Sequence, residues 1–169
     1  MSGEEESKSP YVDTKVKDFE AQIESLEKHY GLSNIYVNPE IENILSYTWN
    51  DLDHMTPEEC SKTIHSIYQY GLSVQVKINR YKSLKAFCMN ALNLVIAGEY
   101  EQYKQSFTPS DVTKYIIIKN NSYAFELNKY VQKYEMNIQM FDNMIHLIES
   151  ISNTFRNMSY IKKNEGNFS

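Results

Sequence analysis

The densest group of chemically useful side chains in the sequence is a run of cations around one tyrosine, between residues 77 and 85. Lys77, Arg80, Lys82 and Lys85 fall within nine residues, and Tyr81 lies among them. Cations bind phosphates, and an aromatic ring offers a stacking surface to an unpaired base. The pattern predicts contact with a single-stranded nucleic acid. The competing interpretation is an ordinary solvated helix face with buried tyrosines.

The distribution of charge along the chain favours the binding interpretation. The 39 residues from Cys60 to Gly98 contain five cations and no acidic residue. Residues 1–55, in contrast, carry 4 basic and 12 acidic side chains, a net charge of −8 in a protein whose total is −5. Such asymmetry is typical of a chain in which one part meets a polyanion.

No pattern in the sequence indicates catalysis, a metal centre or a cofactor. The four histidines are scattered, there is no glycine-rich phosphate loop, and acids such as Glu126, Glu135 and Asp142 stand singly. We therefore expect a protein that is not an enzyme, with no catalytic residue, no metal ligand and no cofactor. Cys60 and Cys88 would lie about 42 Å apart along one helix, too far for a disulfide, so we expect buried, reduced thiols.

Two helix-start signals place the cations on long helices. Thr56-Pro57-Glu58-Glu59 and Thr108-Pro109-Ser110-Asp111 each put Thr at the N-cap, Pro at the first helical position and an acid at the third. From each start, apolar residues recur at alternating spacings of three and four. We expect one helix over residues 57–97, which Gly98 ends, and another over residues 109–161.

The short link between these helices, residues 99–107, predicts a long antiparallel helical hairpin that resembles a coiled coil. If the chain reverses direction near residue 103, residue 80 of the first helix would face residue 126 of the second. Three further cations then come within reach of the first run and complete the predicted nucleic-acid site: Lys119, Lys129 and Lys133.

A shorter helical segment precedes the hairpin. A third apolar stripe runs from Val12 to Tyr30 and ends at Gly31, and a short helix near residues 39–46 follows, with Trp49 just beyond it. The expected fold class is therefore all-α. The expected segments are a disordered acidic tail (1–10), an acidic N-terminal helical segment (11–55), the long helical hairpin (56–163) and a frayed tail (164–169).

The stripes on the two long helices predict assembly. A single hairpin leaves one flank of each stripe open to water, so other helices must cover it, either the N-terminal helices or copies of the same chain. We expect a homo-oligomer. Its predicted interface consists of stripe residues: Ile64, Ile67, Val74, Ile78, Leu92, Ile138, Phe141, Ile145 and Ile148.

The layout of these elements resembles the UvsY-like recombination mediators of large tailed phages, over about residues 15–163. The resemblance rests first on an acidic amphipathic lead-in, Lys17-Asp18-Phe19-Glu20-Ala21-Gln22, and on a long helix with a basic middle that ends near Tyr100–Tyr103. It rests also on a Ser110-Asp111 helix start and on a basic end from Arg156 to Lys163.

This resemblance implies a non-enzymatic factor of DNA recombination and repair that forms ring-like oligomers and binds single-stranded DNA. It implies two protein partners, a RecA-like recombinase that the factor helps to load and the single-strand-binding protein that coats the DNA. By analogy, Lys77, Arg80, Lys82 and Lys85 contact the strand, and the acidic segment 1–55 contacts a protein partner or masks the cations.

The start of the chain has no secretion-signal pattern, and no apolar run approaches the roughly 20 residues of a membrane span. We therefore expect a cytoplasmic protein with no membrane partner, in the host cell's cytoplasm if the chain comes from a phage.

Three other functions fit the same helices. A structural or adaptor protein, such as a virion component or a chaperone, would need no DNA binding. A helical regulator of an RNA polymerase or of another enzyme would bind a basic protein through residues 1–55. An enzyme of an uncharacterised kind is the third, and the missing catalytic motifs disfavour it.

Overall fold

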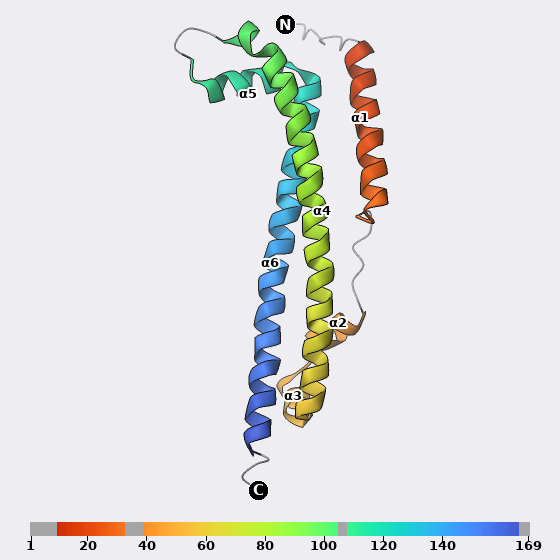
Figure 1. Cartoon of the computed structure of the whole chain (residues 1–169), viewed down its shortest axis with the longest axis vertical. Coiled ribbons are helices and arrows are strands. Elements are labelled where there is room, and N and C mark those ends of the chain that lie inside the picture. The colour runs from red at the N-terminus through yellow and green to blue at the C-terminus, as the bar shows by residue number, and fades with distance from the viewer. Residues whose placement is uncertain (1–9, 33–38, 105–107, 166–169) are drawn as a thin grey trace, which may run out of the picture. The chain divides into compact units, whose positions relative to one another are not determined.

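The computed structural model describes residues 10–32, 39–104 and 108–165, and these residues form helices and no strand (Figure 1). The predicted all-α class is therefore confirmed. The helices are α1 (Pro10–His29), α2 (Pro39–Leu45), α3 (Trp49–His54), α4 (Pro57–Tyr103), α5 (Ser110–Asn120) and α6 (Ser122–Glu165). Over the described part of the chain, no helix combines the length and the apolar character that crossing a membrane requires.

The chain divides into two compact units that cut across the linear segments expected from the sequence. Unit 1 comprises residues 1–33 and 80–136, and unit 2 comprises residues 34–79 and 137–169. Unit 1 therefore contains α1, α5, the C-terminal half of α4 and the start of α6. Unit 2 contains α2, α3, the N-terminal half of α4 and the rest of α6.

Helix α4 begins where the sequence predicts and ends later. The Glu59 amide donates to Thr56 Oγ1 at 3.2 Å, and the Thr56 amide donates to Glu59 Oε2 at 2.7 Å, so the predicted capping box is present. The prediction that Gly98 ends the helix is wrong, because α4 continues to Tyr103. A helical glycine costs only about 1 kcal/mol relative to alanine, too little to stop a helix whose next turn is half-buried.

The second predicted helix is broken in two. Helix α5 begins at Ser110 without a side-chain cap, and Asn121 interrupts the helix with extended backbone angles of −106° and 110°. Asn121 Oδ1 then accepts a hydrogen bond from the Ala124 amide at 2.9 Å and so caps the start of α6. The predicted single helix over 109–161 is therefore wrong at this point, since the polar stretch around Lys119–Ser122 is a helix boundary.

The N-terminal stripe forms α1 as predicted, and Gly31 ends it. Gly31 has a φ of 63°, in the left-handed region that glycine adopts without strain. Its amide donates to the Lys28 carbonyl at 3.0 Å, which satisfies a carbonyl that the helix leaves unpaired. The prediction for residues 1–10 falls outside the described residues except at Pro10, where α1 begins, and part of the predicted C-terminal tail, residues 166–169, also lies outside them.

Helix α3 is a short element that the sequence reasoning missed. Thr48 caps it, since the Asp51 amide donates to Thr48 Oγ1 at 3.4 Å and the Thr48 amide donates to Asp51 Oδ2 at 2.7 Å. The Thr-x-x-Asp spacing is the same signal as the one before α4. It could have been read from the sequence.

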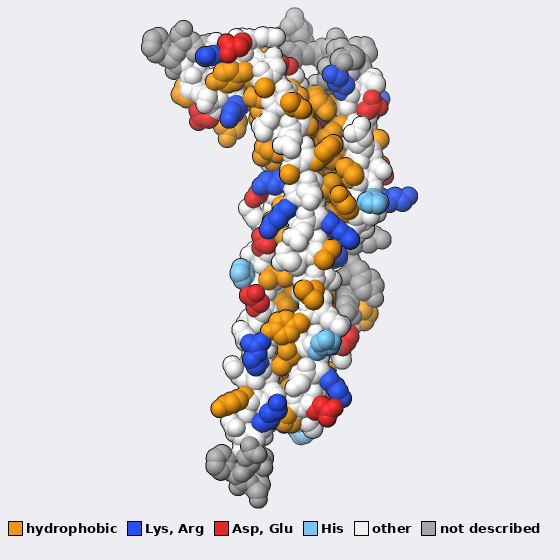
Figure 2. All heavy atoms as spheres, viewed as in Figure 1, with side chains coloured by type: hydrophobic (Ala, Val, Ile, Leu, Met, Phe, Trp, Pro, Cys, Tyr) orange, Lys and Arg blue, Asp and Glu red, His pale blue; other side chains and the backbone are white. Residues whose placement is uncertain are grey.

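Unit 1 contains an aromatic cluster where α1 meets the long helices. Phe19 of α1 is buried, and its ring lies 6.2 Å from the ring of Phe87 on α4 and 6.0 Å and 5.5 Å from those of Tyr123 and Tyr130 on α6. Ile23, one turn further along α1, is also buried. Figure 2 shows apolar side chains gathered where α1 runs beside α4. In this unit α1 covers the apolar stripes of the long helices.

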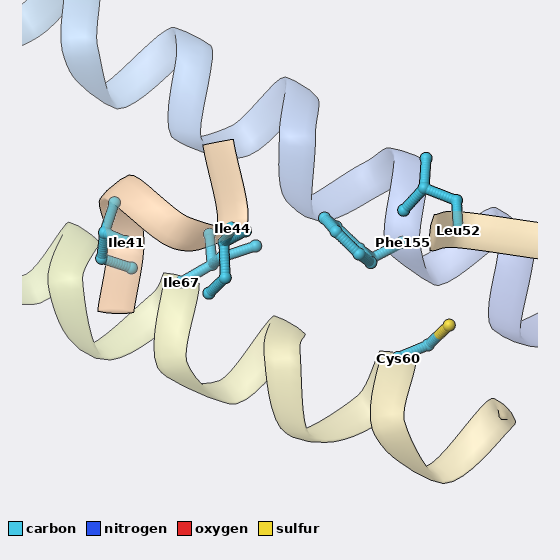
Figure 3. Close-up of a cluster of buried hydrophobic side chains, with 6 residues drawn as sticks. All are labelled: Ile41, Ile44, Leu52, Cys60, Ile67 and Phe155. Carbon is cyan, nitrogen blue, oxygen red and sulfur yellow. The ribbon is translucent and has the colours of Figure 1, made fainter. Parts of the chain in front are cut away.

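The core of unit 2 is mainly aliphatic. Helices α2 and α3 pack onto α4 and α6, and the buried side chains that they bring together appear in Figure 3: Ile41, Ile44, Leu52, Cys60, Ile67 and Phe155. Gly71 of α4 faces Ile148 of α6 closely, because a Cβ built at Gly71 would lie 3.4 Å from Ile148 Cγ2. Short helices therefore cover the stripes in unit 2.

The predicted oligomer-interface residues lie inside the chain. Six of them are buried, namely Ile67, Val74, Ile78, Leu92, Ile138 and Phe141, and three are half-buried, namely Ile64, Ile145 and Ile148. Ile67 is buried in the cluster that α2 and α3 complete, and Ile64 and Ile148 pack against that cluster, so the N-terminal helices, one of the two covers expected from the sequence, cover these three. A second copy of the chain would need a different surface.

Candidate functional site

The predicted nucleic-acid residues are divided between the two units, and carboxylates pair with three of the seven cations. Lys77 belongs to unit 2, where its Nζ lies 6.0 Å from the centre of the Phe141 ring. The other six predicted cations belong to unit 1. Of these, Lys82, Lys119, Lys129 and Lys133 are exposed, whereas Arg80 and Lys85 are half-buried.

Helix α1 supplies partners for two of the cations in unit 1. The Arg80 guanidinium donates to the carbonyl oxygen of Tyr30. Lys133 Nζ lies 2.7 Å from Glu27 Oε1, which also accepts a hydrogen bond from the Tyr134 hydroxyl at 2.8 Å. Tyr134 is fully buried, and both burial and this carboxylate partner raise the pKa of its phenol. Helix α1 is therefore joined to unit 1 through polar contacts as well as apolar ones.

Helix α6 supplies carboxylates to two more of the cations. Lys85 of α4 forms an ion pair with Glu135, and Lys129 Nζ lies 2.7 Å from Glu126 Oε1. Lys129 also lies over the ring of Phe125, 4.9 Å from its centre. Partly exposed pairs such as these contribute only about 0–1 kcal/mol to stability, but they lower the local positive potential. The sequence contains no acid within the basic run, but the folded chain places carboxylates of α6 beside it, so the expectation of uncompensated cations is wrong.

The predicted facing of positions 80 and 126 is also wrong. Within unit 1, Lys85 meets Glu135 and Glu99 accepts a hydrogen bond from Asn121. The positions that face one another are thus displaced by about four turns along α6 from the expected register. The cause is α5, whose eleven residues form a separate helix between the end of α4 and the start of α6.

A polar pocket beside α3 offers no catalytic arrangement. It has a volume of about 410 Å³, and Asp51, His54 and Glu59 are among its lining residues. Hydrogen bonds from Thr48 lower the pKa of Asp51, and hydrogen bonds from Thr56 lower the pKa of Glu59. Both carboxylates are ionised acceptors in capping boxes and are poor general acids. The described residues contain no group of three or more His, Cys, Asp or Glu side chains that could hold a metal ion.

The two cysteines are buried and free, as predicted. Burial raises the pKa of both thiols, and that of Cys88 rises to about 11. Because the thiolate is the reactive form, neither side chain is an activated nucleophile.

Unit 2 has an apolar pocket of about 430 Å³ between α2, α4 and α6. Leu45 and Leu147 lie on it with exposed fractions of 60% and 63%. Among the described residues that line it, Tyr70 is the one with a polar side-chain atom. The described lining is Ile41, Ile44, Leu45, Ile67, Tyr70, Met144, Leu147, Ile148 and Ile151.

The sequence reasoning missed this pocket, although α6 carried a signal for it. Besides the predicted stripe, α6 has a second series of apolar residues at spacings of four, three and four. This series consists of Met140, Met144, Leu147 and Ile151. One helix with two apolar stripes needs cover on two sides.

Comparisons of the chain with protein-family models, with curated proteins and with solved structures found no match.

Proposed function

We propose that this chain is a non-enzymatic helical adaptor or structural protein that binds other proteins through the apolar pocket of unit 2. The observation that carries the proposal is the pocket itself, which is lined by apolar side chains and has two exposed leucines at its edge. Contiguous exposed apolar surface of this kind marks binding sites on soluble proteins.

The lining of the pocket favours a protein partner over a small polar substrate. Its volume lies within the range of about 300–1,000 Å³ that is usual for ligand sites, but such sites carry several polar groups that orient the ligand. In the part of the lining that the structure describes, Tyr70 alone supplies a polar side-chain atom. An amphipathic helix that inserts leucine-like side chains into the pocket does not need additional polar groups in the lining to bind.

The proposal includes an antiparallel hairpin of α4 and α6 in a cytoplasmic protein. Two contacts in unit 1 support antiparallel packing, Lys85 with Glu135 and Glu99 with Asn121. Inside unit 2, Lys77 lies against Phe141, which agrees with the same direction.

The test is selection from a displayed library of amphipathic helical peptides against the full chain. We expect enriched peptides whose binding is lost in Leu147→Glu. The matched control is Leu72→Glu, a leucine of the same unit that is 69% exposed and does not line the pocket. A library that yields no binder for a chain that is monomeric in solution, or binders that Leu72→Glu removes equally, would contradict the proposal.

A second candidate function is that of a single-stranded DNA-binding recombination mediator. The observation that favours it is α1, whose acidic side lies against a basic and aromatic part of unit 1. Glu27 and the Tyr30 carbonyl hold Lys133 and Arg80, and Phe19 lies among aromatic rings. Such an arrangement agrees with the expectation that the acidic segment masks the cations until DNA displaces it. A recombinase and a single-strand-binding protein would then be its partners.

Salt titration of binding to a labelled single-stranded oligonucleotide tests this candidate. If only Lys82 and Lys119 contact phosphates, log affinity falls with log salt at a slope of about −1.4, and release of the cations now held by carboxylates steepens it towards about −3. Lys82→Ala should flatten the slope by about 0.7. No retention of the strand at about 50 mM salt removes this function and leaves the adaptor proposal in place.

A further inference from the structure

The second apolar stripe of α6 in unit 2 has the spacing of a coiled-coil seam. Met140, Met144, Leu147 and Ile151 follow one another at intervals of four, three and four residues, which are alternate d and a positions of a heptad. Leu147 and Met140 are exposed, whereas Met144 and Ile151 are half-buried beside α2. Among the residues that the structure describes, no helix covers the two exposed d positions of this seam.

The face of α6 that packs on α4 within unit 2 is a different one. Ile138 and Phe141 are buried there, and Ile148 meets Gly71. Each residue of an α-helix advances by about 100°, so the stripe through Leu147 points away from the centre of that contact. Among the described residues of unit 2, the apolar side chains of α2 border the stripe only along one side, at the pocket.

The stripe is complementary to itself when two copies of α6 run antiparallel. Antiparallel coiled coils pair a positions with d positions, so Met144 would face Leu147 of a second copy and Met140 would face Ile151. The two-fold axis repeats each pair, which gives four apolar layers from four residues. No other residue of the chain is needed to complete them.

The charges beside the stripe fit a second copy of an acidic unit. Unit 2 carries 5 basic and 9 acidic residues, so two such units repel unless their charges lie away from the contact. On α6 the flanking residues are Asn143, Ser150 and Thr154, which are uncharged, whereas Asp142 and Glu149 fall on the opposite side of the helix. A basic partner would find no acid on α6 beside the stripe.

We infer that a second copy of this chain docks on this stripe, with α6 packed antiparallel against α6 between Met140 and Ile151. The inference rests on the proposed function, because it names the partner of the same pocket. The homo-oligomer contact then lies on the stripe from Met140 to Ile151, and not on the mostly buried residues that the sequence predicted as the interface.

Light scattering during size-exclusion chromatography of the full chain tests the inference. We expect a dimer at micromolar concentrations, a monomer for Leu147→Glu and a dimer for the control Leu72→Glu. Far-ultraviolet circular dichroism shows whether Leu147→Glu keeps its helices, and the exposure of this side chain predicts that it does. A monomeric wild-type chain, or a Leu147→Glu variant that still dimerises, overturns the inference.

Oxidative cross-linking tests the direction of the helices. A mixture of Met140→Cys and Ile151→Cys chains should form a disulfide-linked heterodimer. Met140→Cys alone should not cross-link, because two copies of residue 140 would lie about 16 Å apart along the antiparallel pair. Efficient cross-linking of Met140→Cys alone would show a parallel pair and overturn the inference. If the chain is monomeric but helical peptides still bind the pocket, the proposed function stands and only the second copy is excluded.

Discussion

In each unit, N-terminal helices pack over part of the same two long helices, α4 and α6, but the N-terminal helices of the two units differ in length. The shorter helices of unit 2 leave an apolar pocket beside them. In unit 1 the cover is α1, a helix of 20 residues and so about 30 Å long. In unit 2 the covers are α2 and α3, with 7 and 6 residues, each about 10 Å long. Unit 1 packs an aromatic cluster under α1, whereas unit 2 has an apolar pocket beside α2.

The units also differ in how polar groups enter the core. Unit 1 places Glu27 against Lys133 and the buried Tyr134, so α1 is fixed by direction-dependent contacts. The buried cluster of unit 2 contains aliphatic side chains, one phenylalanine and one thiol. Apolar contacts are not directional, so the apolar surface of unit 2 does not require a binding partner to adopt one fixed orientation.

Of the changes that should affect one unit more than the other, removal of the Phe19 ring from α1 should have the largest effect on the free energy of unfolding. Phe19→Ala should lower the free energy of unfolding by about 3–5 kcal/mol, because Phe19 is buried among three aromatic rings. Trp49→Ala is the control in unit 2, and its 73% exposed side chain predicts a change within about 0.5 kcal/mol. Urea unfolding measures both. Equal effects would mean that α1 does not close unit 1.

Raising the pH should weaken unit 1 before unit 2. Burial raises the pKa of Cys88 to about 11 and raises those of Tyr123 and Tyr130 above their ordinary values. Such groups stabilise the fold below the pKa of the unfolded chain, about 9 for the thiol, and this contribution is lost as the pH rises towards 11. Because both thiols are buried in the folded chain, alkylation followed by mass spectrometry reports the opening of each unit; it should show both cysteines protected at pH 8 and, as unit 1 opens first, Cys88 modified before Cys60 above pH 9. The reverse order would contradict the comparison.

A smaller effect should follow from loss of the phenol that holds α1. Tyr134→Phe should cost about 1–1.5 kcal/mol, because it removes the hydrogen bond to Glu27 and leaves the Lys133 pair in place. Tyr160→Phe, at an exposed tyrosine of unit 2, should change nothing measurable. Urea unfolding of the two variants provides the comparison, and a neutral Tyr134→Phe would show that the polar contact does not fix α1.

The smallest effect concerns the two helical glycines of α4. Gly98→Ala should stabilise unit 1 by up to about 1 kcal/mol, since nothing lies within 4 Å of the added Cβ. Gly71→Ala should gain less, because its Cβ would press on Ile148 Cγ2 at 3.4 Å. Thermal unfolding resolves the difference. An equal gain at both sites would mean that α4 and α6 are less tightly packed at Gly71 than the structure indicates.

Local signals in the sequence determine most of the helix boundaries. The Thr56 capping box opens α4, and Gly31 follows α1 with the left-handed conformation that its lack of a Cβ permits. The polar residues around Asn121 mark the break between α5 and α6, although the apolar spacing on either side of them predicts one helix. An asparagine between two apolar stripes can lie inside a helix or cap the start of one. The hydrogen bond from the Ala124 amide to Asn121 Oδ1 shows that Asn121 is a cap.

By itself, the sequence determined what repeats along the chain, namely the helices, their apolar stripes and the excess of cations between Cys60 and Gly98. These follow from spacing and type, which are local properties. Only the tertiary structure decided which stripe is covered, which acid meets which cation, and how far α6 is displaced against α4 in unit 1. Each of these depends on residues about 50 to 110 positions apart, as for Lys85 with Glu135 and Lys133 with Glu27. Periodicity carries no information at that range, because the length of α5 sets the register.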